Sequence, residues 1–221
     1  MIKATNLVKT FKTGDTKLTV LKGLDIDVKK GEFISITGRS GSGKSTLLYQ
    51  LGLLDHPDSG KIVIDGVEVS KLSERDRTDF RLMELGYVFQ DYAIIPELTA
   101  LENIMMPLLM KGLDMKKAEK QAGEALLKVG LLDKQKNLPS QLSGGEQQRV
   151  SIARAIVHSP KIIFADEPTA NLDVETALVV MKTFLTLNKE GQTIVMVTHE
   201  KEYSDMTSRT LFLNEGVLEN K

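Results

Sequence analysis

The sequence of 221 residues contains no cysteine and no tryptophan, and only 5% of its residues are aromatic. The absence of cysteine excludes disulfides, thiol catalysis and zinc sites built from cysteine. The formal net charge is −1, so the overall charge gives no argument for a nucleic-acid partner. No window approaches the ~18 apolar residues of a membrane-spanning helix, and the opening MIKATNLVKTFK lacks the apolar segment of a secretory signal. We therefore expect a soluble, cytoplasmic protein.

Strand-like and helix-like segments alternate along the chain, which predicts an α/β fold with a parallel sheet. Strands are expected from apolar alternation or short buried apolar runs at 1–31 (with a turn at 13–16), 32–37, 61–66, 86–90, 161–167 and 193–199. Helices are expected at 45–54, 73–85, 99–110, 115–130, 146–158 and 176–191, and a hairpin closes the chain. Gly112 and Gly130 are the expected stops of two of these helices.

The stretch GRSGSGKST, residues 38 to 46, has the form GxxxxGK[ST] and stands between a predicted strand and a predicted helix. Its glycines allow backbone conformations that a Cβ would forbid, so successive N–H groups can point at phosphate oxygens. The following helix adds its positive dipole end. Lys44 would reach the β- and γ-phosphates, and the Ser45 hydroxyl would contact Mg²⁺. A bound nucleotide is therefore predicted, against the alternative of a glycine-rich turn that ends in Lys-Ser by chance.

A second segment, KIIFADEP (161 to 168), is a buried strand that ends in two acids. Asp166 is the candidate Mg²⁺ partner through water, and Glu167 is the candidate group that polarises the attacking water. The alternative is a strand that simply ends in a solvated Asp-Glu turn.

A third segment, LSGGEQQR (142 to 149), begins a predicted helix with Ser143, Gly144 and Gly145, and places Glu146 in its first turn. Exposed amides and a hydroxyl at a helix start suit a γ-phosphate. Taken alone, however, this segment is better explained as a capped helix start without a ligand.

GRSGSGKST, Gln90, LSGGEQQR, IIFADEPTANLD and His199, in this order, resemble the nucleotide-binding subunit of an ATP-binding cassette (ABC) transporter. The resemblance covers nearly the whole chain. It implies a P-loop NTPase core with a parallel sheet, an antiparallel β subdomain and an inserted α-helical subdomain. The chain is then one ABC domain over 1–221, with its core at 1–90 and 159–221 and the helical subdomain at about 91–158.

The resemblance also assigns roles to single residues. Phe11 would stack on adenine; the alternative is that Phe11 packs in the core of the sheet. Asp173 would lie at the interface of a dimer. The implied catalytic residues are Glu167, His199 and Gln90, and the implied metal ligands are Ser45, Gln90 and Asp166. The implied nucleotide contacts are Phe11, Gly38, Arg39, Ser40, Gly41, Ser42, Gly43, Lys44, Ser45 and Thr46, together with Ser143, Gly144, Gly145 and Glu146 of a second chain. Arg39 replaces a frequent proline of the family and Phe11 a common tyrosine, but neither position supplies a catalytic group.

The resemblance implies that the protein binds ATP with Mg²⁺ and hydrolyses it. Two copies are expected to form a homodimer when ATP binds. The dimer would drive a separate integral membrane permease subunit from the inner face of the membrane. The wording of several segments is similar to the lipoprotein-releasing and macrolide-efflux branch, which includes a cell-division member. The alternative is a soluble ABC ATPase that acts in cell division, DNA repair or on ribosomes. DNA-repair members of the family carry long coiled coils or zinc-binding cysteines, and ribosome-acting members carry two cassettes. This sequence has none of these features, which argues against DNA repair and ribosomes. A small-molecule kinase would leave LSGGEQQR and His199 unexplained.

The partner surface is expected in the apolar segment 91–110, which follows Gln90. An amphipathic helix of the membrane subunit could lie in a groove there. The side chains expected to line this groove are Tyr92, Ile94, Ile95, Leu98, Met105 and Met106. For the methionines of this segment, ordinary filling of the core is the favoured alternative.

Overall fold

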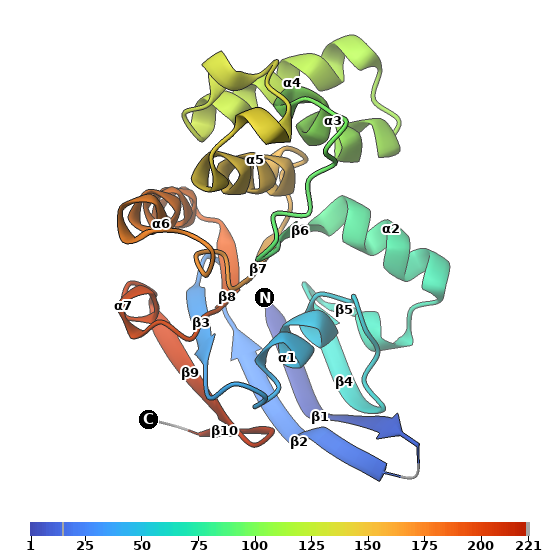
Figure 1. Ribbon diagram of the computed structural model, residues 1–221. Coiled ribbons are helices and arrows are strands. Elements are labelled where there is room, and N and C mark those ends of the chain that lie inside the picture. The colour runs from blue at the N-terminus through green and yellow to red at the C-terminus, as the bar shows by residue number, and fades with distance from the viewer. Residues whose placement is uncertain (15, 220–221) are drawn as a thin grey trace. The chain divides into compact units, whose positions relative to one another are not determined.

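The computed structural model describes residues 1–14 and 16–219 and divides into two compact units (Figure 1). The first unit contains Met1–Asp79 and Gly191–Lys221, and the second contains Phe80–Glu190. The predicted turn at 13–16 includes residue 15, which lies outside the described residues. The predicted partition into core and helical subdomain stays a prediction.

The first unit contains a four-stranded antiparallel sheet, in the order β2-β1-β4-β5. Its strands are β1 (Ile2–Thr13), β2 (Thr16–Val28), β4 (Ser59–Ile64) and β5 (Val67–Glu68). Ile2 at the start of β1 pairs with Val28 on one side and with Ile64 on the other, and all three are buried. The β structure predicted for residues 1–31 is confirmed, and the end of β2 alternates as expected, with Leu24, Ile26 and Val28 buried.

The same unit contains a mainly parallel set of strands that positions the phosphate loop. β3 (Phe33–Thr37) pairs in parallel with β8 (Thr193–Val197) and β9 (Arg209–Asn214), and β10 (Val217–Glu219) completes a hairpin with β9. Because parallel strands end at a common edge, the loops after β3 and β8 leave the sheet on the same side. α1 (Lys44–Leu51) follows the first of these loops and α7 (Lys201–Ser204) the second.

The second unit combines a parallel strand pair with four helices. β6 (Leu85–Val88) pairs with β7 (Ile162–Asp166), whose five residues are all buried. The helices are α3 (Ala100–Met110), α4 (Met115–Lys128), α5 (Gly144–Ile156) and α6 (Val174–Lys189), and α5 packs on β6, α3, α4 and α6. α2 (Glu74–Glu84) lies where the chain passes from one unit to the other.

Most predicted elements are confirmed, with ends that differ by at most three residues. Gly112 and Gly130 follow α3 and α4 with positive φ angles of 82° and 70°, as expected of glycines just beyond a helix end. The four-residue α7 was not predicted, because one helical turn carries no periodic signal. Within residues 1–14 and 16–219, no helix is long and apolar enough to cross a membrane.

Candidate functional site

The predicted site residues fall into two sets, one in each unit. The first unit holds Phe11, Gly38, Arg39, Ser40, Gly41, Ser42, Gly43, Lys44, Ser45, Thr46 and His199. The second unit holds Gln90, Ser143, Gly144, Gly145, Glu146, Asp166 and Glu167.

The phosphate loop begins a helix in a way that leaves its first turn open to an anion. Gly41 and Gly43 have φ angles of 78° and 101°, in the left-handed region that favours glycine. Gly43 is the N-cap of α1 and supplies no side-chain hydrogen bond, whereas α3, α4, α5 and α6 are each capped by a side chain. The amides at the start of α1 therefore have no side-chain cap from any described residue, as is typical of helix starts that bind phosphate.

Two buried polar groups converge on this loop. The Lys44 ammonium, only 9% exposed, donates to the carbonyls of Gly38 (3.1 Å) and Arg39 (3.2 Å). These carbonyls stabilise its charge but do not neutralise it. The Ser42 hydroxyl oxygen is buried and has no hydrogen-bond partner among the described residues. A Cβ on Gly38 would lie 2.2 Å from the Leu213 carbonyl oxygen, so the loop can pack against β9 only with glycine at this position.

His199 lies at the same edge of the parallel strands as the phosphate loop. It follows β8, and the pairing of Ile36 with Val197 aligns the ends of β3 and β8. The buried Thr198 donates its N–H to the Ile36 carbonyl (3.2 Å) and accepts from the Glu200 N–H (3.1 Å), which fixes the backbone on both sides of His199. The His199 side chain itself is exposed.

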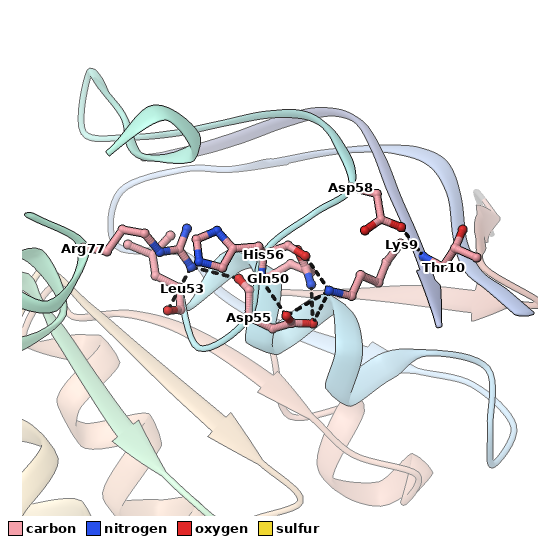
Figure 2. A network of polar contacts seen from close by, with 8 residues as sticks. All are labelled: Lys9, Thr10, Gln50, Leu53, Asp55, His56, Asp58 and Arg77. Carbon is pink, nitrogen blue, oxygen red and sulfur yellow. Dashed lines mark hydrogen bonds and ion pairs between the residues drawn. The ribbon is translucent and has the colours of Figure 1, made fainter. Parts of the chain in front are cut away.

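Phe11 lies on β1 with 42% of its surface exposed, so it is not a core aromatic. The Lys9 ammonium is 5.3 Å from the centroid of its ring, at cation–π distance. Lys9 is held in turn by the Asp55 carboxylate (2.8 Å) and the His56 carbonyl (2.6 Å), which belong to the turn after α1 (Figure 2). This network ties β1 to the segment that follows the phosphate-loop helix, and Phe11 beside it stays partly exposed.

The buried Arg77 secures the same turn from α2 (Figure 2). Its guanidinium donates to the carbonyls of Leu53 (3.1 Å) and Asp55 (2.9 Å). Burial acts to raise the pKa of the Asp55 carboxyl, but the hydrogen bonds from Lys9 and from the His56 N–H, together with the charges of both residues, outweigh it, so the pKa lies below its usual value.

In the second unit, β7 delivers the two candidate acids at its carboxyl end. Asp166 is the last residue of the strand and is 8% exposed. Glu167 follows with a φ angle of 45°, which is uncommon for a residue with a Cβ. Its carbonyl accepts from the Ala170 N–H (3.2 Å), which closes a tight turn. Backbone strain of this kind is concentrated at functional sites.

The LSGGEQQR segment forms the start of α5 through a capping box. The Ser143 hydroxyl accepts from the Glu146 N–H (3.3 Å), and the Glu146 carboxylate accepts from the Ser143 N–H (2.8 Å). The latter bond holds the pKa of Glu146 below its usual value. A Cβ on Gly145 would lie 2.0 Å from the Thr176 methyl group, so glycine is required for α5 to pack against the start of α6. Asp173, itself exposed, caps that start by accepting from Thr176.

Gln90 is exposed after β6, and its carbonyl accepts from the Asn171 amide (3.1 Å). The segment that follows differs in part from the expected groove. Ile95 is 38% exposed, but Met105 is only 6% exposed, because its position on α3 faces the helical core; its predicted place in the groove is wrong. Tyr92 is half-buried, with its hydroxyl 2.8 Å from where a Cβ on Gly144 would lie.

Sequence inspection missed two polar residues of α5 that contact this region. Gln148 is fully buried and donates to the carbonyls of Phe89 and Pro168. Arg154 donates to the carbonyls of Tyr92 and Ala93, and burial lowers the pKa of its guanidinium. The sequence offered one sign of these contacts, which is that Gln148 and Arg154 are polar residues within the otherwise apolar face of a predicted helix.

The residues present suit a magnesium nucleotide better than an isolated metal ion. Across the described residues, no group of three or more His, Cys, Asp or Glu side chains could hold a metal. Mg²⁺ in nucleotide sites needs only one or two carboxylates, because phosphates and water complete its octahedron. The orphaned Ser42 hydroxyl, the Lys44 ammonium and the open start of α1 all match the acceptor oxygens of a polyphosphate.

Comparisons with known proteins agree with this geometry. The family model described as ABC transporter matches residues 21–170. The lipoprotein-releasing system ATP-binding protein LolD of Aquifex aeolicus (strain VF5) is 49% identical over 216 residues, which cover 98% of this chain and 95% of that protein. The uncharacterized ABC transporter ATP-binding protein YknY of Bacillus subtilis (strain 168) is 43% identical over 98% of this chain and 94% of that protein.

Among solved structures, a dimeric post-hydrolysis state of the ATP-binding cassette MJ0796 bound to ADP and Pi matches with a TM-score of 0.92 and 40% identity. The match covers 100% of this chain and 97% of that one. The predicted fold class and the predicted resemblance are both confirmed. The chain therefore belongs to the ABC transporter family, as an ATP-binding subunit that is similar in sequence to lipoprotein-releasing ATP-binding proteins.

Proposed function

We propose that this chain hydrolyses ATP in the presence of Mg²⁺ and uses the reaction to drive a separate membrane protein. The observation that carries the proposal is the start of α1, where an uncapped helix end, two left-handed glycines and the buried Lys44 surround a position suited to phosphate oxygens. Members of the ABC ATPase family hydrolyse ATP, and the similar MJ0796 cassette is bound to ADP and Pi.

Each catalytic group has a role that follows from its chemistry. Lys44 would exchange its two carbonyl partners for the β- and γ-phosphates, which neutralise its charge better. Glu167 would accept a hydrogen bond from the attacking water, and His199 would donate to the γ-phosphate. Phe11 would stack on the adenine ring with its exposed face.

Three groups are proposed as metal ligands: the Ser45 hydroxyl, the Gln90 amide oxygen and, through water, Asp166. Oxygen ligands of this kind, with only one carboxylate, are typical of nucleotide-bound Mg²⁺. When bound, Mg²⁺ supplies positive charge that neutralises the phosphate oxygens in the transition state.

We further propose that two copies of the chain enclose ATP between the phosphate loop of one and the Ser143 signature of the other. Ser143 uses one lone pair of its hydroxyl for its own helix cap and keeps its O–H free to donate to a γ-phosphate. The Gly144 and Gly145 amides at the start of α5 would join it, with Glu146 in the capping box that fixes them. The dimeric cassettes among the similar structures support this arrangement.

The partner is proposed to be an integral membrane subunit, and the chain to act at the inner face of the membrane. Lipoprotein-releasing relatives support extraction or mechanical transmission as the process that is driven. The exposed Ile95 and the half-buried Met106 are proposed contacts for an apolar helix of that subunit.

Glu167→Gln tests the catalytic proposal, because the amide keeps the shape of the side chain but is a much weaker base. ATP binding should persist while turnover falls by about 100-fold or more. Light scattering should detect an ATP-bound dimer that accumulates. Glu124→Gln, the same exchange at an exposed position of α4, is the matched control and should behave like the wild type. Near wild-type turnover by the Glu167 variant would refute the assignment.

A further inference from the structure

The fully buried Gln148 connects the two catalytic segments of the second unit through one amide group. Its Nε2 donates to the Pro168 carbonyl at 2.7 Å and to the Phe89 carbonyl at 3.3 Å. Pro168 directly follows Glu167, and Phe89 directly precedes Gln90. The side chain of one α5 residue therefore holds the peptide next to each of two proposed catalytic groups.

The orientation of this amide is determined by its surroundings. A primary amide carries two N–H donors on nitrogen and only acceptors on oxygen. If the group were rotated by 180°, its oxygen would face two carbonyl oxygens and repel both. Both donors are thus occupied, one by each segment.

The oxygen of the same amide differs from its nitrogen in having no partner among the described residues. The Gln148 Oε1 atom is buried and accepts no hydrogen bond from any residue that the structure describes. A buried acceptor without a protein partner acts against stability, whereas the two bonds that Nε2 donates act in its favour. What only a side chain with two N–H donors can supply at this position is the bridge between the Phe89 and Pro168 carbonyls.

Two neighbouring contacts reinforce the connection. The Asn171 amide, four residues beyond Glu167, donates to the Gln90 carbonyl at 3.1 Å. Arg154, also on α5, donates to the carbonyls of Tyr92 and Ala93, which follow Gln90 by two and three residues. Tyr92 and Ala93 have positive φ angles of 62° and 49°, a strained conformation that needs such support.

We propose that Gln148 is a positioning residue for ATP hydrolysis, which fixes Gln90 and Glu167 relative to each other from the signature helix. This inference rests on the proposed ATPase function. Movement of α5 when its first turn meets a nucleotide is then transmitted to both catalytic segments together, so that the water-polarising Glu167 and the metal-binding Gln90 reach their working positions at the same time.

Gln148→Met is the decisive variant, because methionine is unbranched and of similar length but has no N–H donor. We expect this variant to fold with a moderately lower stability to urea, because removal of the orphaned oxygen only partly offsets the loss of the two donated hydrogen bonds. The KM for ATP should stay within about twofold, while kcat falls by about 10- to 100-fold, as expected when a catalytic group is misplaced. Gln148→Glu should lower kcat further, because a carboxylate would face the two carbonyls.

Hydrogen exchange supplies a readout that packing alone would not change. In the Gln148→Met protein, the amides of 89–93 and of 167–171 should both exchange faster, while those of α4 should not. Gln121→Met, on the exposed face of α4, is the matched control and should leave all of these quantities unchanged.

The outcomes are distinguishable. A Gln148→Met protein with wild-type kcat overturns the inference, because the amide would then have no role in positioning the catalytic groups. A Gln148→Met protein that does not fold also overturns it, because the amide would then be needed for folding alone. Faster exchange in only one of the two segments overturns the connection. A wild-type chain that does not hydrolyse ATP overturns the proposed function and this inference with it.

Discussion

Gly145→Ala should destabilise this protein, although alanine is the better helix former. The added Cβ would lie 2.0 Å from the Thr176 methyl group, far inside van der Waals contact. Thr176 cannot easily turn away, because its side chain is β-branched and its hydroxyl donates to the Asp173 carboxylate at 2.6 Å. Overpacking of this kind costs about 1–3 kcal/mol, and the helix preference of alanine returns about 0.5–1 kcal/mol. The net loss should be about 0.5–2 kcal/mol.

A second substitution should reverse this loss. Thr176→Ser removes the clashing methyl group and keeps the hydroxyl that binds Asp173. The next atoms that the Cβ at 145 would meet, the Cβ and Oγ1 of Thr176, lie at 3.4 and 3.9 Å, which is ordinary contact. The double variant should therefore be about as stable as the wild type, with a coupling energy of about 1–3 kcal/mol between the two sites.

Urea denaturation of the four chains without nucleotide measures this cycle. Gly123→Ala is the matched control, because it is also a glycine within a helix but nothing lies within 4 Å of its added Cβ. It should stabilise the protein by about 0.5–1 kcal/mol. The reasoning is refuted if Gly145→Ala is as stable as the control variant, or if Thr176→Ser fails to rescue it.

Two further predictions concern pH and the partner surface. Burial lowers the pKa of His158 below its ordinary value of 6.5, and its Nε2–H donates to the Leu85 carbonyl (3.0 Å). As the pH falls below 6.5, the unfolded chain therefore binds this proton before the folded protein does, so the free energy of unfolding should decrease. Over the same pH range, the His158→Gln protein should show a smaller decrease in its free energy of unfolding. Ile95→Asp should leave basal ATPase activity intact, because Asn103 holds both backbone groups of residue 95 at 2.7 and 3.0 Å, but should abolish co-purification with the membrane subunit. Undiminished co-purification would place the coupling surface elsewhere.

Local patterns in the sequence determined most of the elements and the single motifs. The phosphate loop depends on left-handed glycines and a helix start within nine residues, and the capping box of Ser143 and Glu146 spans one helical turn. Interactions of this range are encoded in the spacing of the residues themselves. Residues 89–93 and the short α7 had no comparable pattern.

Tertiary packing alone decided which side chains support those motifs. Gln148 contacts a carbonyl that is 59 residues away in the chain, and Gly145 is required only because the start of α6 lies against it. Met105, on the apolar helix α3, is core rather than surface because of the direction in which that helix packs. Such contacts depend on how elements distant in sequence approach one another, and a glutamine, a glycine or a methionine carries no local sign of the neighbour it will meet.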